Sequence, residues 1–344
     1  MAAQLAGWVD DAAAQEDAYL RLMDLQPKNE VAMAQWIGVL TRRAQYEDAI
    51  EVANSRFPDL ATAPRVAVAV ATALVAANRF DDALKVLDAC AVASMSHADL
   101  SPKIIALRQR AMPLFGRWTA EQAVRADEES KAQNARVQFT TSKGTILIEL
   151  FEQQAPATSL SFVELVENRT YDGTRFHRRL PGFAVLGGDV NTKVGATSRP
   201  GFGTIGWRIP DEGKRSDRRE AFGGTIGLCK AVDTSPSSPP NGAFVPKSAG
   251  SQFFFLLQPA EFLHDDAANF TIFGRIIDGW ETVAALGPGD ELIAATVVRK
   301  GAHEYKSVRE PELPKPMEMS VPTQALRAPQ PTGVPGQPRP ITPR

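Results

Sequence analysis

The periodicity of apolar residues changes abruptly at Arg136, and this change limits what the chain can fold into. From Val137 to Thr141, and again from Thr145 to Phe151, apolar and polar residues alternate, with Ser142-Lys143-Gly144 between the two runs. Alternation on both sides of a short turn is typical of a β-hairpin. The chain before Arg136 has no such alternation and is rich in Ala, Leu, Gln and Glu. The sequence therefore predicts a helical region followed by a β domain.

Residues 1–134 are predicted to be wholly helical and to contain a repeat. The segment QYEDAIEV at 45–52 recurs as RFDDALKV at 79–86, which is 34 residues later. A period of 34 residues resembles that of tetratricopeptide helix pairs. A generic helical bundle stays an alternative, because two copies are fewer than the three that an independent solenoid usually needs. Helices are predicted at 31–44, 64–77, 101–112 and 118–134.

Residues 135–307 are predicted to form one β domain. After the hairpin, Pro156 stands in the first turn of a predicted helix, and short strands with glycine-rich turns follow to about residue 305. A strand pair, a helix and further strands favour a closed antiparallel β-barrel with capping helices. Residues 310–344 then hold 10 of the 25 prolines. We therefore expect 308–344 to be a disordered tail with polyproline II character.

Composition excludes several classes of partner and cofactor. A net charge of −2 and a pI of about 6.2 give no general attraction to nucleic acid or to an anionic membrane. The two cysteines, Cys90 and Cys229, fall in different predicted domains, which argues against a disulfide framework. The four histidines are scattered, so no metal or cofactor is expected. The start of the chain lacks the pattern of a signal peptide, and a cytoplasmic location is predicted.

Two short segments of the β domain carry the functional signal. FHRRLPGF at 176–183 runs into Gly187-Gly188-Asp189, and GSQFFF stands at 250–255. A guanidinium and an amide within an aromatic wall suit a neutral, proline-containing peptide, and do not suit phosphate or metal. At these residues the chain resembles the cyclophilin family of peptidyl-prolyl cis–trans isomerases. The resemblance covers about residues 136–305 and implies a role in protein folding, as a chaperone whose helical repeats dock a partner or client.

The resemblance also implies roles for particular residues. Arg178 would be the catalytic arginine, Phe183 the floor of the proline pocket, and Gln252 a hydrogen-bonding partner of the substrate backbone. Taken alone, Arg178 would more often be a surface arginine paired with a carboxylate, and His177 a packed strand residue. The implied substrate-binding residues are Ala184, Leu186, Lys230, Ala231, Phe254, Phe262, Leu263 and Phe270.

The chain departs from the family pattern at several of these positions. Leu186 stands where active cyclophilins usually have glutamine, and leucine cannot join a polar network. Ala184 replaces a bulkier apolar residue, and Phe262 takes a place often held by tryptophan. The loop at 232–249, which includes Phe244, is longer than usual and is either a tolerated insertion or a lid.

Two functions from different classes therefore stay open. The first is an isomerase that acts on X–Pro bonds of peptides and client proteins. The second is a scaffold that binds proline segments and turns them over poorly, as Leu186 favours. A third, weaker hypothesis is that the tail, at Ala328-Pro329, occupies the site as a tethered ligand.

Overall fold

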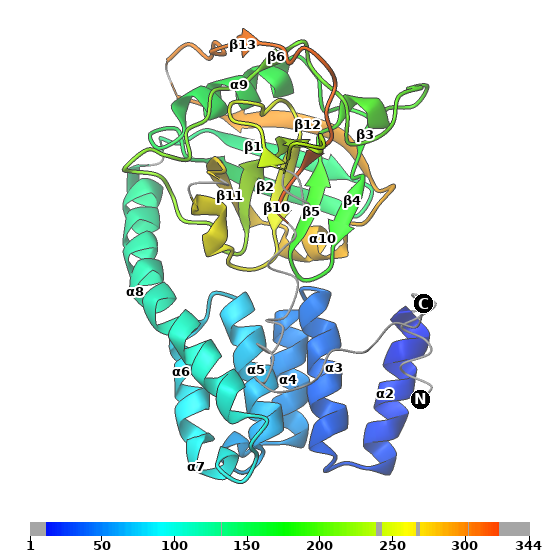
Figure 1. Ribbon diagram of the computed structural model, residues 1–344, viewed down its shortest axis with the longest axis vertical. Helices are drawn as coiled ribbons and strands as arrows, with labels where there is room; N and C mark the ends of the chain where they lie inside the picture. Colours follow the sequence, from blue (N-terminus) through cyan, green and yellow to red (C-terminus); the bar gives the residue numbers. More distant parts are fainter. Residues whose placement is uncertain (1–11, 132, 239–242, 266–268, 302, 323–344) are drawn as a thin grey trace, which may run out of the picture.

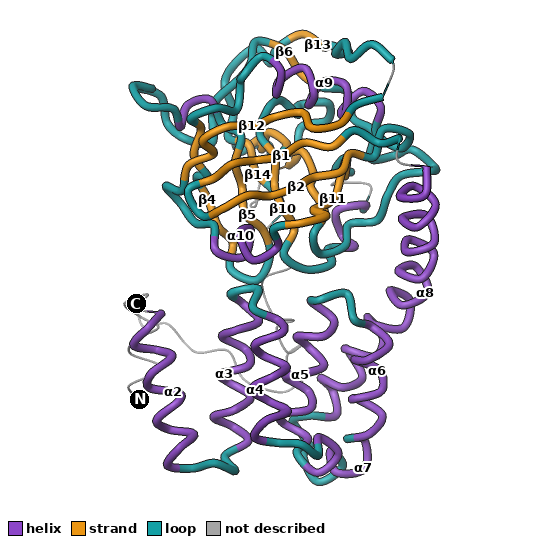
Figure 2. The backbone as a smooth tube through the Cα atoms, turned by 180° about the vertical axis from the view of Figure 1, so that it is seen from behind, coloured by secondary structure: helices purple, strands orange, loops and turns teal. Residues whose placement is uncertain are grey.

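The computed structural model describes residues 12–131, 133–238, 243–265, 269–301 and 303–322. Its helical part lies below its sheet part, and α8 rises along one side of the helices to reach the sheet (Figure 1). The view from behind shows the same two layers (Figure 2). Among the described residues, no helix has the length and apolar character needed to cross a bilayer.

The N-terminal part is helical, as predicted. Apolar side chains from most of its helices share one core that contains Trp36, Val70, Phe80 and Leu114. The helices are α2 (Ala12–Leu25), α3 (Glu30–Arg42), α4 (Tyr46–Arg56), the 3-10 turn η1 (Leu60–Thr62), α5 (Pro64–Ala76), α6 (Phe80–Ala89), α7 (Ala91–Ser94) and α8 (Ser101–Lys131).

The predicted 34-residue period reappears in the backbone. The first residue of α5 lies 34 positions after that of α3, and the first residue of α6 lies 34 positions after that of α4. The turns repeat as well, since Ala44 and Asn78 both adopt a left-handed conformation, with φ of 63° and 61°. The structure thus contains two helix pairs with the predicted spacing. Membership of the tetratricopeptide family stays a prediction.

The expected break between helices at 101–112 and 118–134 is wrong. One helix, α8, runs through Pro113 without interruption. Proline removes one backbone donor and normally ends or kinks a helix. Here Ala111 and Leu114, on either side of the proline, are buried in the helical core. Tertiary packing on both sides of Pro113 therefore holds the helix together despite the lost hydrogen bond.

The C-terminal part is built on a nine-stranded antiparallel sheet in the order β3-β12-β1-β2-β11-β7-β10-β5-β4. Its predicted hairpin is formed by β1 and β2, whose register pairs Phe139 with Ile146. The strands are β1 (Arg136–Thr141), β2 (Gly144–Leu150), β3 (Thr174–Arg175), β4 (Arg178–Leu180), β5 (Ala184–Gly187), β7 (Thr225–Leu228), β10 (Phe253–Leu256), β11 (Ile272–Asp278) and β12 (Glu291–Arg299).

β3 and β4 are the first and last strands in the hydrogen-bonded order of this sheet. One isolated bridge joins Arg175 to Asp189, beyond the end of β5. The antiparallel sheet is confirmed, whereas its closure into a barrel stays a prediction. The helices of this part are α9 (Pro156–Glu167), α10 (Trp280–Ala285), η2 (Val190–Thr192) and η3 (Glu261–His264).

The two faces of β10 contribute to different cores. Phe253 and Phe255 pack with Phe139 of β1 and Phe162 of α9 in the main core. Phe254 lies on the opposite face, as strand alternation requires. It belongs to a second group, called the site cluster below. Its buried members are Phe151, Leu180, Phe183, Ala184, Leu186, Ala221, Cys229, Ala231, Phe254, Leu256, Ala260, Leu263, Phe270, Ile272, Met319 and Val321.

The expectation of a disordered tail from residue 308 is wrong for its first part. Residues 309–322, called the C-terminal strap below, form β13 (Glu310–Pro311) and β14 (Met319–Ser320). β13 pairs with β6 (Trp207–Arg208), and β14 joins β8 (Lys230–Asp233) and β9 (Ala243–Phe244). Apolar side chains at alternate positions of the strap pack into the site cluster. This packing orders the segment despite its proline content. Ala328-Pro329 lies outside the described residues.

The helical part packs directly on loops of the sheet part. The Asn78 side chain donates to the backbone oxygen of Gly223 (3.0 Å) and accepts from its amide (3.1 Å). Phe222 enters the helical core, with its ring 4.8 Å from that of Trp118. The Tyr46 hydroxyl donates to the Leu257 oxygen, and burial raises the pKa of this phenol. These loops adjoin strands and turns that carry the site.

Candidate functional site

The sheet register brings three of the predicted residues into one row. Arg178 of β4 lies opposite Leu186 of β5, and Leu186 lies opposite Phe254 of β10. Directly opposed residues of neighbouring strands project from the same face of a sheet. Gly227 of β7 is the next member of the row, and a methyl group there would lie 2.4 Å from the Phe254 ring. A glycine at this position therefore leaves room for the aromatic ring.

Aromatic rings surround this row. The Phe183 ring stacks on the Phe262 ring with centroids 5.7 Å apart, and the Phe254 ring meets the Phe270 ring edge-on at 5.9 Å. Such paired rings add to the stability of apolar packing. Leu263 is fully buried among them. The structure thus gathers the predicted apolar residues, with Ala184 and Leu186, into or against the site cluster.

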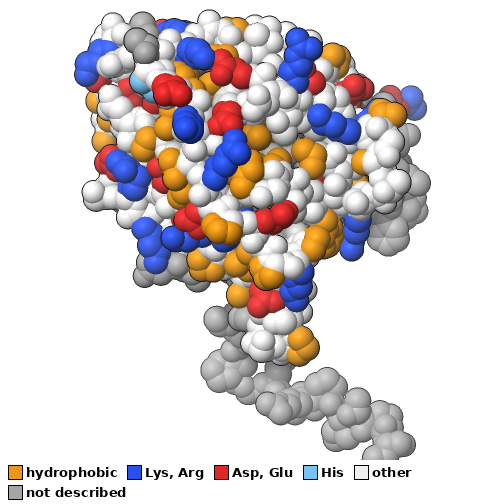
Figure 3. Space-filling model, turned by 90° about the horizontal axis from the view of Figure 1, so that it is seen from above, with side chains coloured by type: hydrophobic (Ala, Val, Ile, Leu, Met, Phe, Trp, Pro, Cys, Tyr) orange, Lys and Arg blue, Asp and Glu red, His pale blue; other side chains and the backbone are white. Residues whose placement is uncertain are grey.

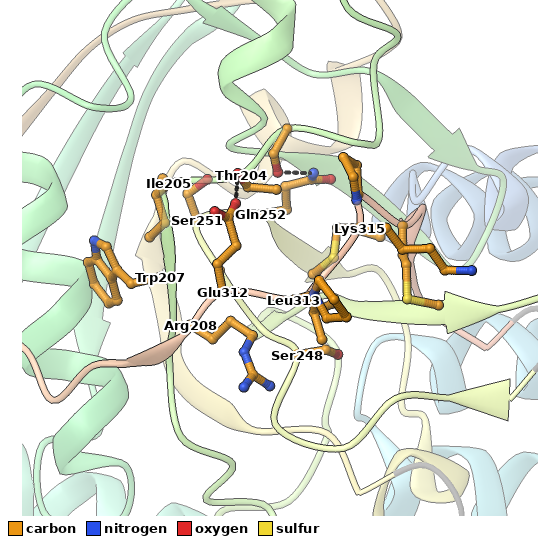
Figure 4. A pocket seen from close by; sticks show the side chains of 16 residues that line it. Thr204, Ile205, Trp207, Arg208, Ser248, Ser251, Gln252, Glu312, Leu313 and Lys315 are labelled. Atoms are coloured by element: carbon orange, nitrogen blue, oxygen red, sulfur yellow. Dashed lines mark hydrogen bonds between the residues drawn. The ribbon is translucent and has the colours of Figure 1, made fainter.

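Gln252 lies beside the cluster and lines a cavity of about 220 Å³. Its Nε2 donates to the Gly203 backbone oxygen (3.1 Å), whereas its buried Oε1 has no hydrogen-bond partner among the described residues. Figure 4 shows Gln252 on one side of the cavity and Glu312, Leu313 and Lys315 of the strap on the other. An unsatisfied buried acceptor is costly, so this oxygen is suited to accept from a ligand N–H.

Lys230 and Ala231 border the site through their backbones. The Lys230 ammonium is buried and paired with Asp211 (2.8 Å), and it lies 5.6 Å from the centre of the Phe270 ring. It is therefore not directed at a ligand. In β14, Ser320 lies opposite Lys230 and Met319 lies opposite Ala231. An extended segment next to these two residues is held by main-chain pairing.

Arg178 contacts the strap rather than open solvent. Its Nη1 donates to the Ser320 hydroxyl (3.2 Å) and lies 3.7 Å from a carboxylate oxygen of Glu318. The Arg178 side chain is 38% exposed. The competing view of Arg178 as a surface arginine paired with a carboxylate has some support from Glu318. However, that carboxylate belongs to a segment that itself occupies the site.

The long loop at 232–249 also reaches the site. Phe244 of β9 pairs with Val232 of β8, and its ring meets the Phe270 ring edge-on at 4.9 Å. Phe244 is therefore part of the wall of the site cluster and not a free surface side chain. Whether the loop acts as a lid stays a prediction, and its residues 239–242 lie outside the described part of the chain.

Two titratable groups at the site are held neutral by burial. Burial lowers the pKa of His177, and the neighbouring Arg178 adds to this effect against the pull of Asp189. Neither ring nitrogen of His177 has a hydrogen-bond partner among the described residues. Burial likewise raises the pKa of the Cys229 thiol. Both side chains are packed apolar neighbours of the site and not reactive groups.

Two larger pockets, one beside Tyr46 and one beside Arg65, contain none of the site residues predicted from the sequence. Figure 3 shows acidic and basic side chains interspersed over the face seen from above. Within the described residues, no group of three His, Cys, Asp or Glu side chains could hold a metal ion. The arrangement can bind an extended apolar peptide and direct a guanidinium at its backbone.

The strap is the main part of the site that sequence reasoning missed. Met317-Glu318-Met319-Ser320-Val321 alternates apolar and polar residues, which is a strand signal. It was hidden by the prolines on both sides. The loop around Gly201–Arg208 was also missed, and it carries no motif that would have marked it.

We expect acid to destabilise the fold through His264, at the end of η3. Burial lowers the pKa of His264 to about 4, helped by Arg218 and Arg117 and opposed by Asp265. The unfolded state therefore binds a proton at a higher pH than the folded state does, and stability falls as pH drops from about 6.5 towards 4. In wild type, the free energy of unfolding in urea should be lower at pH 5 than at pH 7. This decrease should be about 1–2 kcal/mol smaller in His264→Leu. Equal differences would exclude His264 as a cause.

Comparison with known proteins identifies the family of the sheet part. The family model for cyclophilin type peptidyl-prolyl cis-trans isomerase/CLD matches residues 136–299. Peptidyl-prolyl cis-trans isomerase ppi1 of Schizosaccharomyces pombe is 33% identical over 153 residues, which is 44% of this chain and 85% of that protein. The chain belongs to the cyclophilin-type isomerase family. The match places the cyclophilin domain in the sheet part and leaves the helical part unmatched.

Two further comparisons cover similar shares of this chain. Human peptidyl-prolyl cis-trans isomerase-like 1 is 32% identical over 155 residues, which is 45% of this chain and 81% of that protein. A crystal structure of a cyclophilin type isomerase from Cryptosporidium parvum is 23% identical and has a TM-score of 0.39, covering 48% of this chain and 99% of that one.

Proposed function

We propose that the cyclophilin domain is a peptidyl-prolyl cis–trans isomerase that acts on X–Pro bonds in peptides and folding proteins. The observation that carries this proposal is the row of Arg178, Leu186 and Phe254 on three adjacent strands. It sets a permanent cation next to an apolar aromatic pocket. The names of the relatives, which are isomerases, support the same reaction class.

The reaction asks for no nucleophile and no metal. Amide resonance sets a barrier of about 18–20 kcal/mol for rotation about the C–N bond. In the twisted state the proline nitrogen regains its lone pair, so a donor directed at it lowers the barrier. Arg178 would supply this donor, since a guanidinium is always charged and offers several N–H groups in one plane. The contact is stronger in the transition state than in the ground state, which is what catalysis requires.

Binding is divided between the pocket and the peptide backbone. Phe183, Phe254, Phe262, Leu263 and Phe270 would hold the proline ring. The free Oε1 of Gln252 would accept from a substrate N–H. Ala231 and Lys230 would pair with the residues before the proline through their main chain, because the Lys230 ammonium is already bound to Asp211.

One observation favours the second candidate, a scaffold that binds proline segments with little turnover. Leu186, opposite Arg178 in the sheet, is fully buried. A glutamine there could support the guanidinium and the substrate carbonyl, whereas leucine offers no hydrogen bond. The loss of one such contact costs on the order of 1 kcal/mol, which is about a tenfold lower rate.

The chain is proposed to divide into a helical docking domain (1–134), a cyclophilin domain (135–307) and a proline-rich C-terminal segment (308–344). The 34-residue recurrence of helix pairs supports the first of these as a tetratricopeptide-like platform for a protein partner. Its contacts with Gly223 and Leu257 would hold a bound client close to the cyclophilin domain.

The two candidates are separated by the cis–trans exchange rate of a short Ala-Pro peptide, measured by NMR. We expect wild type to accelerate exchange and Arg178→Ala to lower this acceleration at least tenfold, because the donor to the proline nitrogen is lost. Leu186→Gln is expected to raise the rate by about tenfold. Arg175→Ala is the matched control, since it removes an exposed arginine from β3 outside the site.

One outcome would decide against the isomerase, and another against Arg178 as its catalytic group. If wild type does not accelerate exchange while Leu186→Gln does, the domain is a degenerate binding module. If wild type is active and Arg178→Ala equals it, the catalytic group lies elsewhere.

A further inference from the structure

The last described part of the strap lies between two walls of the site. On one side, β14 pairs with β8, and the Val232 amide donates to the Glu318 oxygen (2.8 Å). On the other side, the Met319 amide donates to the Gly201 oxygen (2.7 Å). Main-chain bonds on both sides hold an extended segment independently of its side chains. This is how a sheet edge binds a peptide strand.

The side chains of the segment fill the site cluster. Met319 is 8% exposed and Val321 is 2% exposed, and both belong to the cluster that contains Phe183 and Phe254. Leu313 and Met317 pack against it from the strap. The apolar residues at alternate positions thus enter the space proposed for a proline substrate.

The polar contacts follow the same pattern. Arg178, the proposed catalytic group, donates to the hydroxyl of Ser320 between the two buried residues. Pro322 follows Val321, so an X–Pro bond begins at the residue next to the one that Arg178 contacts. The segment therefore engages both the cation and the apolar pocket, as a bound substrate would.

The strap is anchored upstream, away from the site. β13 pairs with β6, and Arg309 stacks over the Trp207 ring at 4.7 Å. Glu310 is paired with Lys247 (3.2 Å). This anchor would keep the end of the strap near the site after β14 has detached.

We infer that residues 317–322 are a ligand of the site in cis, so that free proline peptides bind only by displacing them. The inference rests on the proposed function for the location of the site, but not for its catalysis. It also defines the class of ligand that the site takes in trans. That ligand is an extended segment with apolar residues on both sides of a serine, followed by proline.

Detachment is feasible because β14 contains only two residues. Short elements with few backbone hydrogen bonds open locally at much lower free energy than a domain unfolds. A tethered ligand has an effective concentration of about millimolar, which lowers the apparent affinity of a competing peptide without changing the site. A protein with a similar segment that binds the site more tightly than the strap does would displace the strap.

The test uses the full chain with Val321→Lys, which sets a charge in the apolar cluster and next to Arg178. The probe is a peptide with residues 316–322, Pro-Met-Glu-Met-Ser-Val-Pro, and its Kd is measured by fluorescence polarisation. We expect at least tenfold tighter binding to Val321→Lys than to wild type. Val308→Lys is the matched control, because Val308 is a 50% exposed valine of the preceding segment, and it should bind as wild type does.

A second measurement reports the strap directly. The Val232 amide should exchange with solvent at least tenfold faster in Val321→Lys, since it loses its acceptor on Glu318. Unchanged exchange in this variant would overturn the inference, as would faster exchange without tighter peptide binding. Both readouts are independent of catalysis. A chain that releases the strap and binds the peptide, yet isomerises nothing, would refute only the proposed enzyme.

Discussion

Glu149→Leu is expected to lower the free energy of unfolding by about 3–5 kcal/mol, the range for removing one partner of a buried ion pair. Glu149 is completely buried in β2 and accepts from three arginines, on β1, β11 and β12. The shortest of these N–O distances are 2.8 Å to Arg136, 2.7 Å to Arg275 and 3.1 Å to Arg299. Without the carboxylate, three cations would face one another with little access to water.

The titration of Glu149 points the same way. Burial alone would raise the pKa of this carboxyl, but hydrogen bonds from Arg275 and Arg136 outweigh burial and hold the pKa below its ordinary value. A depressed folded-state pKa means that the carboxylate contributes stability above the ordinary pKa of about 4.3. That contribution is lost as pH falls through the folded-state value.

Urea unfolding followed by circular dichroism measures this effect. The matched control is Lys300→Ala, which breaks an exposed pair with Glu167 on the same domain. Exposed pairs contribute only about 0–1 kcal/mol, so the control should shift the midpoint little. Similar shifts for both variants would show that Glu149 and its three arginines do not stabilise the sheet.

Arg219→Leu is the second change with a large expected effect, again about 3–5 kcal/mol. Arg219 precedes the loop that enters the helical core, and its side chain is 4% exposed. It donates to Glu121 (2.6 Å) and Glu128 (2.6 Å), both on α8, and stacks 3.9 Å from the centre of the Phe151 ring. The substitution would leave Glu128 buried without a cation, whereas Glu121 keeps Arg125 at 2.7 Å.

The loss should be concentrated where α8 meets the sheet part. We expect amide hydrogen exchange to accelerate in residues 120–128 and 219–223 before it does in the β1–β2 hairpin. Arg219→Leu combined with Glu128→Leu should recover at least about 1 kcal/mol, since the stranded carboxylate is gone.

Arg117→Ala is the control for this interface. It removes a more exposed pair with Glu220 between the same two elements and should cost less than about 1 kcal/mol. A double variant no more stable than Arg219→Leu would indicate that Arg219 acts through its contact with Phe151 and not through charge.

The sequence alone predicted the elements whose local pattern is strong. The alternation around Phe139 and Ile146 specified a hairpin, because side chains in strands point to opposite faces in turn. The 34-residue recurrence predicted the spacing of the helix pairs, whereas the left-handed turns at Ala44 and Asn78 are seen only in the structure. The resemblance at Arg178 and Gln252 led to the family that comparison then identified. The roles of these residues stay predictions until exchange rates are measured.

Other features depended on contacts between distant residues. Pro113 was expected to end a helix, but buried neighbours on both sides carry α8 through it. The contact of Lys230 with substrate stays a prediction, but its ammonium is held by Asp211, a residue without a motif. In both cases, contacts with residues distant in the sequence outweigh the local preference.

Local periodicity thus determined which segments are helices or strands and where the family signature lies, because these depend on residues a few positions apart. The occupant of the site was decided only by the tertiary structure. Met319 and Ser320 form a strand because β8 and Gly201 offer backbone hydrogen-bonding groups on both sides and the site cluster offers apolar surface to Met319 and Val321. A proline-rich segment gains these contacts only after the domain around it has folded, and no pattern within the segment specifies its partner.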